Sequence, residues 1–78
     1  MSLIFTIGGK QVSISKADVE AAVKGVQPES IKKYRVQIGG VDFPIKQVLA
    51  AAIHMPTAAF ISTDAYRILT RLGFEVRT

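Results

Sequence analysis

The chain has 78 residues, 49% of them hydrophobic, and its ten Lys and Arg against six Asp and Glu give a formal net charge of +4. This length allows one domain over residues 1–78, and with no cysteine and a single histidine the chain has no disulfide, thiolate or multi-histidine metal site. The longest apolar run, VLAAAI, is too short to span a bilayer, and the first residues do not resemble a signal peptide. We therefore expect a small cytoplasmic domain without cofactors.

The first part of the chain is predicted to form a hairpin followed by a helix. Alternating apolar residues over Leu3–Ile7 indicate a strand, and Gly8-Gly9 supplies a two-residue turn in which positive φ angles cost little. Ser15 is the expected N-cap of the helix, with Asp18 near its positively polarised end. The helix is expected to end at Gly25.

The stretch that starts at Tyr34 repeats this order of elements with an offset of 31 residues, so that residues 36–54 correspond to residues 5–23. In this alignment Ile38-Gly39-Gly40 corresponds to Ile7-Gly8-Gly9. A second helical stripe of apolar residues ends before Pro56. A lone hairpin is marginal in water. We therefore interpret the repeat as structural reuse, and we expect the two hairpins to share one sheet beneath the helices.

A third helix is predicted in STDAYRILTRLGF, because apolar residues recur at helical spacing over Ala65–Leu72. Ser62 or Thr63 is expected to cap this helix, and Gly73 is expected at its C′ position. The final stretch, FEVRT, is predicted to be a short strand. The predicted fold class is therefore α+β, with two β-hairpins each followed by a helix, a third helix and a short C-terminal strand.

From Tyr34 onward the chain carries a spaced pattern: an aromatic residue with a lysine three positions on, a run of small residues, a Phe and a Ser, and a Leu-Gly-Phe triplet. The positions are Phe43 and Lys46, the small residues 50–52, Phe60 and Ser62, and Leu72-Gly73-Phe74. This pattern resembles the N-terminal head domain of McrA-type HNH restriction endonucleases, which also occurs in related defence proteins. The capped segment SISKADVEAAV is similar to the first helix of that family. The resemblance implies a DNA-associated or assembly role, but no nuclease activity, because one histidine does not supply an HNH site.

Candidate nucleic-acid contacts lie on the outward side of the third helix. Arg67 and Arg71 are one turn apart, so their guanidinium groups share a face that can approach phosphates or a major groove. Tyr66 and Thr70 would add hydrogen-bond donors to this face. The last two helices loosely imitate a helix-turn-helix, with a longer turn than is usual. The alternative is a solvated helix face whose arginines have no function.

Lys32, Lys33 and Arg35 form a second basic cluster, and Lys46 is expected to lie nearby. The functional interpretation is a phosphate-contacting loop and strand edge, whereas the alternative is a solubilising turn that discourages strand pairing. Lys46 falls in the first turn of a helix, where a cation is unfavourable. We therefore expect Lys46 to have a partner, either Asp42 in a local ion pair or a bound phosphate.

The sequence contains no recognisable catalytic pattern. His54 has no evident nucleophile or orienting carboxylate, and neither Gly-Gly pair belongs to a P-loop motif. We therefore predict a non-catalytic nucleic-acid-binding module without a cofactor, which binds double-stranded DNA through the basic face of the third helix. The alternative is a protein–protein or self-association module, such as a homodimer, of a defence or mobile-element system, which the high apolar fraction favours.

Overall fold

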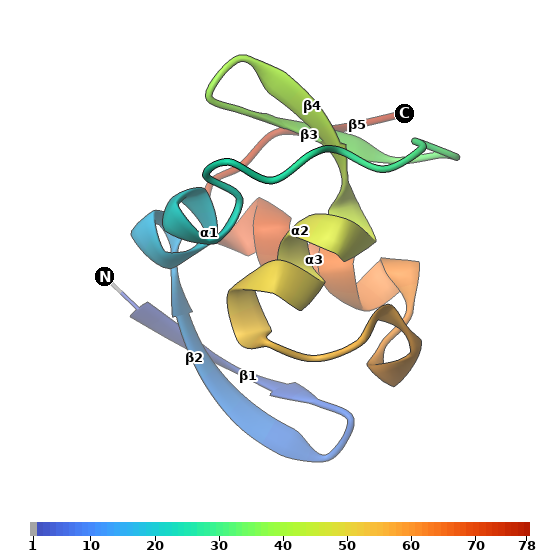
Figure 1. Ribbon diagram of the computed structural model, residues 1–78. Coiled ribbons are helices and arrows are strands. Elements are labelled where there is room, and N and C mark those ends of the chain that lie inside the picture. The colour runs from blue at the N-terminus through green and yellow to red at the C-terminus, as the bar shows by residue number, and fades with distance from the viewer. Residues whose placement is uncertain (1) are drawn as a thin grey trace.

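The computed structural model describes residues 2–78, and its fold is shown in Figure 1. Over these residues the chain forms five strands, three α-helices and one 3-10 turn. This arrangement confirms the predicted α+β class. The elements are β1 (Ser2–Ile7), β2 (Lys10–Ser15), α1 (Lys16–Ala22), β3 (Arg35–Ile38), β4 (Val41–Pro44), α2 (Ile45–Ile53), η1 (Thr57–Ala59), α3 (Ser62–Arg71) and β5 (Val76–Arg77).

The two hairpins are repeats of each other in structure as well as in sequence. Each turns at a Gly-Gly pair, and all four of these glycines have φ angles between 57° and 79°. Such angles favour glycine because it has no Cβ atom to clash with the backbone. The cross-strand registers are also equivalent. Phe5 lies opposite Val12 in the first hairpin, and Val36 lies opposite Phe43 in the second.

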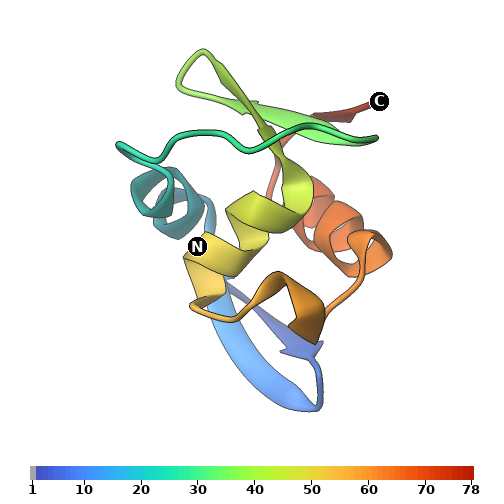
Figure 2. The ribbon, with the colours of Figure 1, turned by 45° about the vertical axis from the view of Figure 1, so that its right-hand side comes forward.

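The two hairpins lie in separate sheets, so the prediction that they share one sheet is wrong. β1 and β2 form a two-stranded sheet, whereas the second sheet has the strand order β4-β3-β5. The sheets lie at opposite ends of the molecule, with the helices between them (Figures 1 and 2). The edge of β3 away from β4 is filled by β5, with Val36 opposite Val76. That edge is therefore closed to the first hairpin.

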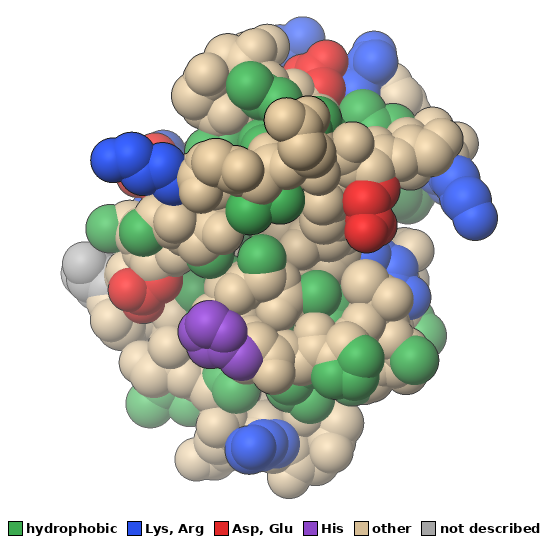
Figure 3. All heavy atoms as spheres, viewed as in Figure 1, with side chains coloured by type: hydrophobic (Ala, Val, Ile, Leu, Met, Phe, Trp, Pro, Cys, Tyr) green, Lys and Arg blue, Asp and Glu red, His purple; other side chains and the backbone are tan. Residues whose placement is uncertain are grey.

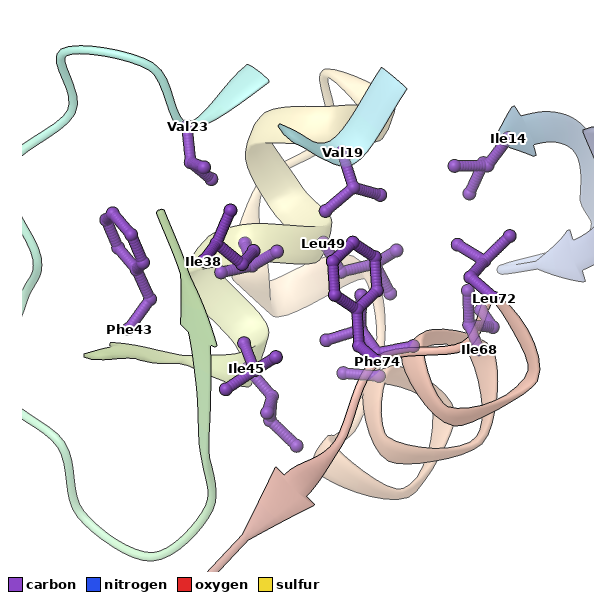
Figure 4. Packing of buried hydrophobic residues seen from close by; sticks show 14 of the residues in the cluster. Ile14, Val19, Val23, Ile38, Phe43, Ile45, Leu49, Ile68, Leu72 and Phe74 are labelled. Carbon is purple, nitrogen blue, oxygen red and sulfur yellow. The ribbon is translucent and has the colours of Figure 1, made fainter. Parts of the chain in front are cut away.

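One hydrophobic core joins the helices to both sheets (Figure 4). Ile14 of β2, Leu49 of α2 and Ile68 of α3 are each at most 1% exposed. Burying a side chain of this size contributes about 1.5–3 kcal/mol. Within residues 2–78 no polar or charged residue is buried. The core is therefore apolar throughout, and the charged side chains remain at the surface.

Two of the predicted helix ends are confirmed. The Ser15 hydroxyl accepts a hydrogen bond from the Asp18 N–H at 3.0 Å, and the Asp18 carboxylate accepts one from the Ser15 N–H at 2.9 Å. At the end of α3, Gly73 has a φ angle of 99° and the Phe74 N–H donates to the Leu69 carbonyl at 3.0 Å. This is the Schellman arrangement that a C′ glycine favours.

The predicted cap of α3 at Ser62 or Thr63 is wrong. The helix begins at Ser62, so the N-cap position belongs to Ile61, whose side chain has no hydrogen-bonding group. The Asp64 carboxylate accepts a hydrogen bond from the Ile61 N–H at 3.3 Å instead. This carboxylate also lies at the positive end of the helix, where a negative charge is favourable.

Candidate nucleic-acid interface

All three of the predicted phosphate-binding lysines lie around one surface hollow of about 300 Å³. Lys32 and Lys33 come from the long connection between α1 and β3, and Lys46 comes from the first turn of α2. We call this site the lysine hollow. Hydroxyl groups also line it, and one acidic side chain, Glu29, lies at its wall. The hydroxyl residues are Ser30, Tyr34, Thr57 and Ser62.

Two of the lysines lie over aromatic rings. The Lys33 ammonium group is 5.2 Å from the centre of the Tyr34 ring, and the Lys46 ammonium group is 5.5 Å from that of Phe60. Among the residues that the structure describes, the ion pairs are Arg67–Asp64 and Arg77–Glu75. The expected pair between Lys46 and Asp42 is therefore not formed. A cation–π contact contributes about 0.5–1 kcal/mol where the cation is exposed, as Lys33 is, and it does not neutralise the ammonium charge.

Gln47 holds the lysine-bearing connection against α2, and sequence reasoning did not identify it. Its side-chain oxygen accepts a hydrogen bond from the Glu29 N–H at 2.8 Å. Its side-chain nitrogen donates to the Gln27 carbonyl oxygen at 2.9 Å. Both bonds join segments far apart in the sequence, so no local pattern could indicate them. They help to place Lys32 and Lys33 beside the first turn of α2.

Tyr66 of α3 lies next to the lysine hollow through its contact with Tyr34. The two ring centroids are 5.2 Å apart and the ring planes are inclined by 66°, which is the favourable edge-to-face geometry. Tyr34 lines the hollow, and Tyr66 is 41% exposed. One predicted site residue of α3 is therefore close to the predicted lysine cluster.

The other predicted residues of α3 have partners of their own. The Arg67 guanidinium donates to the Asp64 carboxylate at 3.5 Å, and the Thr70 hydroxyl donates to the Tyr66 carbonyl at 2.6 Å. The Arg71 guanidinium lies 5.7 Å from the centre of the Phe5 ring in β1. Arg71 thus extends toward the first hairpin. None of these three side chains lines the lysine hollow.

Arg35 is separated from Lys32 and Lys33, although the three are close in sequence. It lies on the outer face of the three-stranded sheet, beside a polar hollow of about 330 Å³ that Arg77 and Glu75 also line. Arg35 is directly opposite Arg77 in the strand register, and Glu75 accepts a hydrogen bond from Arg77 at 2.7 Å. Glu75 thus offsets one of the two like charges, whose repulsion would otherwise destabilise the pairing.

The face of the molecule seen in Figure 3 carries no single extended basic patch. Its lysine and arginine side chains are spread around the periphery, with acidic side chains between them. His54, the one histidine of the chain, is exposed on this face and ends α2 with a left-handed φ angle of 57°. Within residues 2–78, no group of His, Cys, Asp and Glu side chains is placed to hold a metal ion.

None of the described helices combines the length and the apolar character needed to cross a membrane.

The fold and the lysine hollow define a small α+β domain built from a repeated hairpin–helix unit. A family model described as SCO5918-like matches residues 6–78. The chain therefore belongs to the SCO5918-like family. No curated protein and no solved structure gives a significant match to the chain. Nothing in these comparisons links it to the McrA-type head domains, and that resemblance stays an expectation from the sequence.

Proposed function

We propose that the chain is a non-catalytic nucleic-acid-binding module that contacts the phosphates of double-stranded DNA at the lysine hollow. The observation that carries this proposal is the convergence of Lys32, Lys33 and Lys46 on one hollow. Within the described residues, none of the three is paired with a carboxylate. A cytoplasmic location belongs to the same proposal.

The chemistry of the hollow suits a phosphate chain better than a small uncharged ligand. Three ammonium groups face one carboxylate, that of Glu29, so the hollow has a positive balance. The hydroxyl groups of Thr57 and Ser62 are available to donate to phosphate oxygens. Contacts of this kind position a duplex without reading its bases. We therefore expect binding with little sequence preference.

Helix α3 has a secondary part in this proposal. Tyr66 stands beside the hollow and offers a hydroxyl donor. Arg67 is 55% exposed, and its ion pair with Asp64 is of the kind that contributes only about 0–1 kcal/mol. A phosphate can therefore compete for Arg67 at little cost. Arg71 and Arg35 lie outside the hollow and are expected to contribute mainly to long-range attraction.

The test is fluorescence anisotropy of a labelled DNA duplex titrated with the protein at several salt concentrations. Three phosphate contacts correspond to a slope of about −2.7 in log affinity against log salt, or about a 40-fold loss of affinity for a fourfold rise in salt. The double variant K32Q/K46Q is expected to lose about two thirds of this slope.

The matched control is K10Q/K24Q, which removes the same charge from exposed positions that do not line the hollow. It is expected to retain nearly the full slope. Equal losses in the two double variants would show that net charge, and not the lysine hollow, drives binding. The absence of binding at low salt would rule out the proposed function.

A further inference from the structure

The first hairpin presents an unprotected strand edge. Within residues 2–78, β1 pairs with β2 alone, and its second edge carries no strand. The six residues of β1, SLIFTI, include no charge and no proline, and their register with β2 is continuous without a bulge. Proteins normally protect such edges with lysine, proline or a bulge. Ile4 at the centre of the strand is also 71% exposed.

The internal repeat shows what this edge can accept. β1 is equivalent to β3, because with the 31-residue offset Ile4 corresponds to Arg35 and Thr6 corresponds to Gln37. In the second hairpin, the edge of β3 away from β4 holds β5, which runs antiparallel with Arg77 opposite Arg35. The same structural unit thus takes up an antiparallel third strand at the position that is open on β1 (Figure 1).

The register shows which backbone groups face the open edge. Ile7 and Lys10 flank the two-residue turn, so they form a pair that exchanges two hydrogen bonds, and such pairs alternate along an antiparallel ladder. Phe5 and Leu3 are therefore bonded toward β2. The backbone N–H and C=O groups of Ser2, Ile4 and Thr6 point the other way.

We propose that β1 pairs antiparallel with β1 of a second copy, about a twofold axis at Ile4, to form a four-stranded sheet in the order β2-β1-β1-β2. Ile4 then lies opposite the partner's Ile4, and Ser2 lies opposite the partner's Thr6. This register pairs the outward backbone groups of all three residues, whereas a shift by two positions leaves some of them unpaired.

Two observations favour a second copy over another peptide as the occupant. The outward positions of β1 are self-complementary about Ile4, as a twofold interface requires, and the uncharged strand brings no repulsion when it meets itself. On the inner face, the register sets Leu3, which is half-buried, beside the partner's Phe5. The pairing thus extends the apolar face of the hairpin. It does not depend on the lysine hollow.

The first test compares two lysine variants by sedimentation velocity over a range of protein concentrations. Ser13 lies directly opposite Ile4 on β2 and is also exposed, so I4K and S13K add the same charge to the same face of the hairpin. Only I4K sets two like charges against each other at the twofold axis. The parent and S13K are expected to reach twice the monomer mass, while I4K associates several-fold more weakly.

The second test measures amide hydrogen exchange in the parent chain and needs no variant. The N–H groups of Ile4 and Thr6 are expected to exchange more slowly as the protein concentration rises, whereas those of Leu3 and Phe5 are protected by β2 at every concentration. A parent that stays monomeric overturns the proposal. Equal association of I4K and S13K, or exchange at Ile4 and Thr6 that is independent of concentration, also overturns it.

Discussion

The rings of Tyr34 and Tyr66 meet edge to face, with their centroids 5.2 Å apart. Tyr34 directly follows Lys32 and Lys33 in the sequence, and Tyr66 lies on α3. The contact therefore ties the lysine-bearing connection to a helix that begins almost thirty residues later in the sequence. Tyr34 lines the lysine hollow, as does Gln47, which holds the same connection to α2.

The tyrosine contact is expected to be measurable as a coupling energy. In a double-mutant cycle with Y34A and Y66A, urea unfolding should give a coupling of about 0.5–1 kcal/mol, which is typical of an edge-to-face pair. Tyr66→Phe keeps the ring and is the control, so the cycle of Y34A with Y66F should give a coupling energy near zero. Additive effects of the two alanine variants would contradict a stabilising contact between these rings.

Loss of the Gln47 side chain is expected to loosen the lysine-bearing connection. Gln47→Leu removes both backbone contacts and should lower the free energy of unfolding by about 1 kcal/mol. The Glu29 amide should exchange faster, and DNA affinity should fall although every lysine is still present. Gln11→Leu alters an exposed glutamine on β2 and is the control. Unchanged exchange at Glu29 in the Gln47 variant would contradict the holding role.

Alanine substitutions at equivalent turn positions should differ in cost. Gly8 and Gly39 have nearly the same φ angle, 57° and 60°, so alanine is strained at both by about 1 kcal/mol. At Gly8 the new Cβ would also lie 3.3 Å from the Ala59 carbonyl oxygen, whereas at Gly39 nothing lies within 4 Å. We therefore expect G8A to be the less stable variant in chemical denaturation. Equal stabilities of G8A and G39A would contradict this expectation, because they would show that η1 shifts away from the added Cβ atom without cost.

Glycine at position 54 is expected to stabilise the chain. His54 ends α2 with a left-handed φ angle of 57°, which costs a residue with a Cβ atom more than it costs glycine. His54→Gly should raise the free energy of unfolding by up to about 1 kcal/mol, after the greater entropy of an unfolded glycine is allowed for. His54→Ala keeps the Cβ atom and should give no such gain. A glycine variant less stable than the parent would contradict this interpretation.

The parts of the fold that depend on local chemistry could be predicted from the sequence. The Gly-Gly turns, the Ser15 cap and the C′ position of Gly73 each follow from residues within a few positions of one another. The pairing of distant strands could not be predicted in this way, because the second neighbour of β3 in its sheet is β5, at the far end of the chain. The alternation of apolar and polar residues within a hairpin does not indicate which distant strand pairs with its open edge.

The candidate site likewise has parts that the sequence predicts and parts that depend on contacts between distant segments. Lys32, Lys33 and Lys46 were predicted to lie near one another, and the structure brings them to one hollow. Arg35 was grouped with them because it is close in sequence, although strand alternation places it on the outer face of the sheet. The role of Gln47 could not be predicted, because both of its partners belong to a segment without regular structure.

The most direct measurement of the proposed function is amide chemical-shift mapping of the isotopically labelled chain during titration with a short DNA duplex. The proposal predicts the largest shifts at Lys32, Lys33, Lys46 and the start of α2, fading as salt is added. Shifts centred on Arg35 and Arg77 at the outer face of the three-stranded sheet, or no shifts at low salt, would contradict the assignment of the lysine hollow as the nucleic-acid interface.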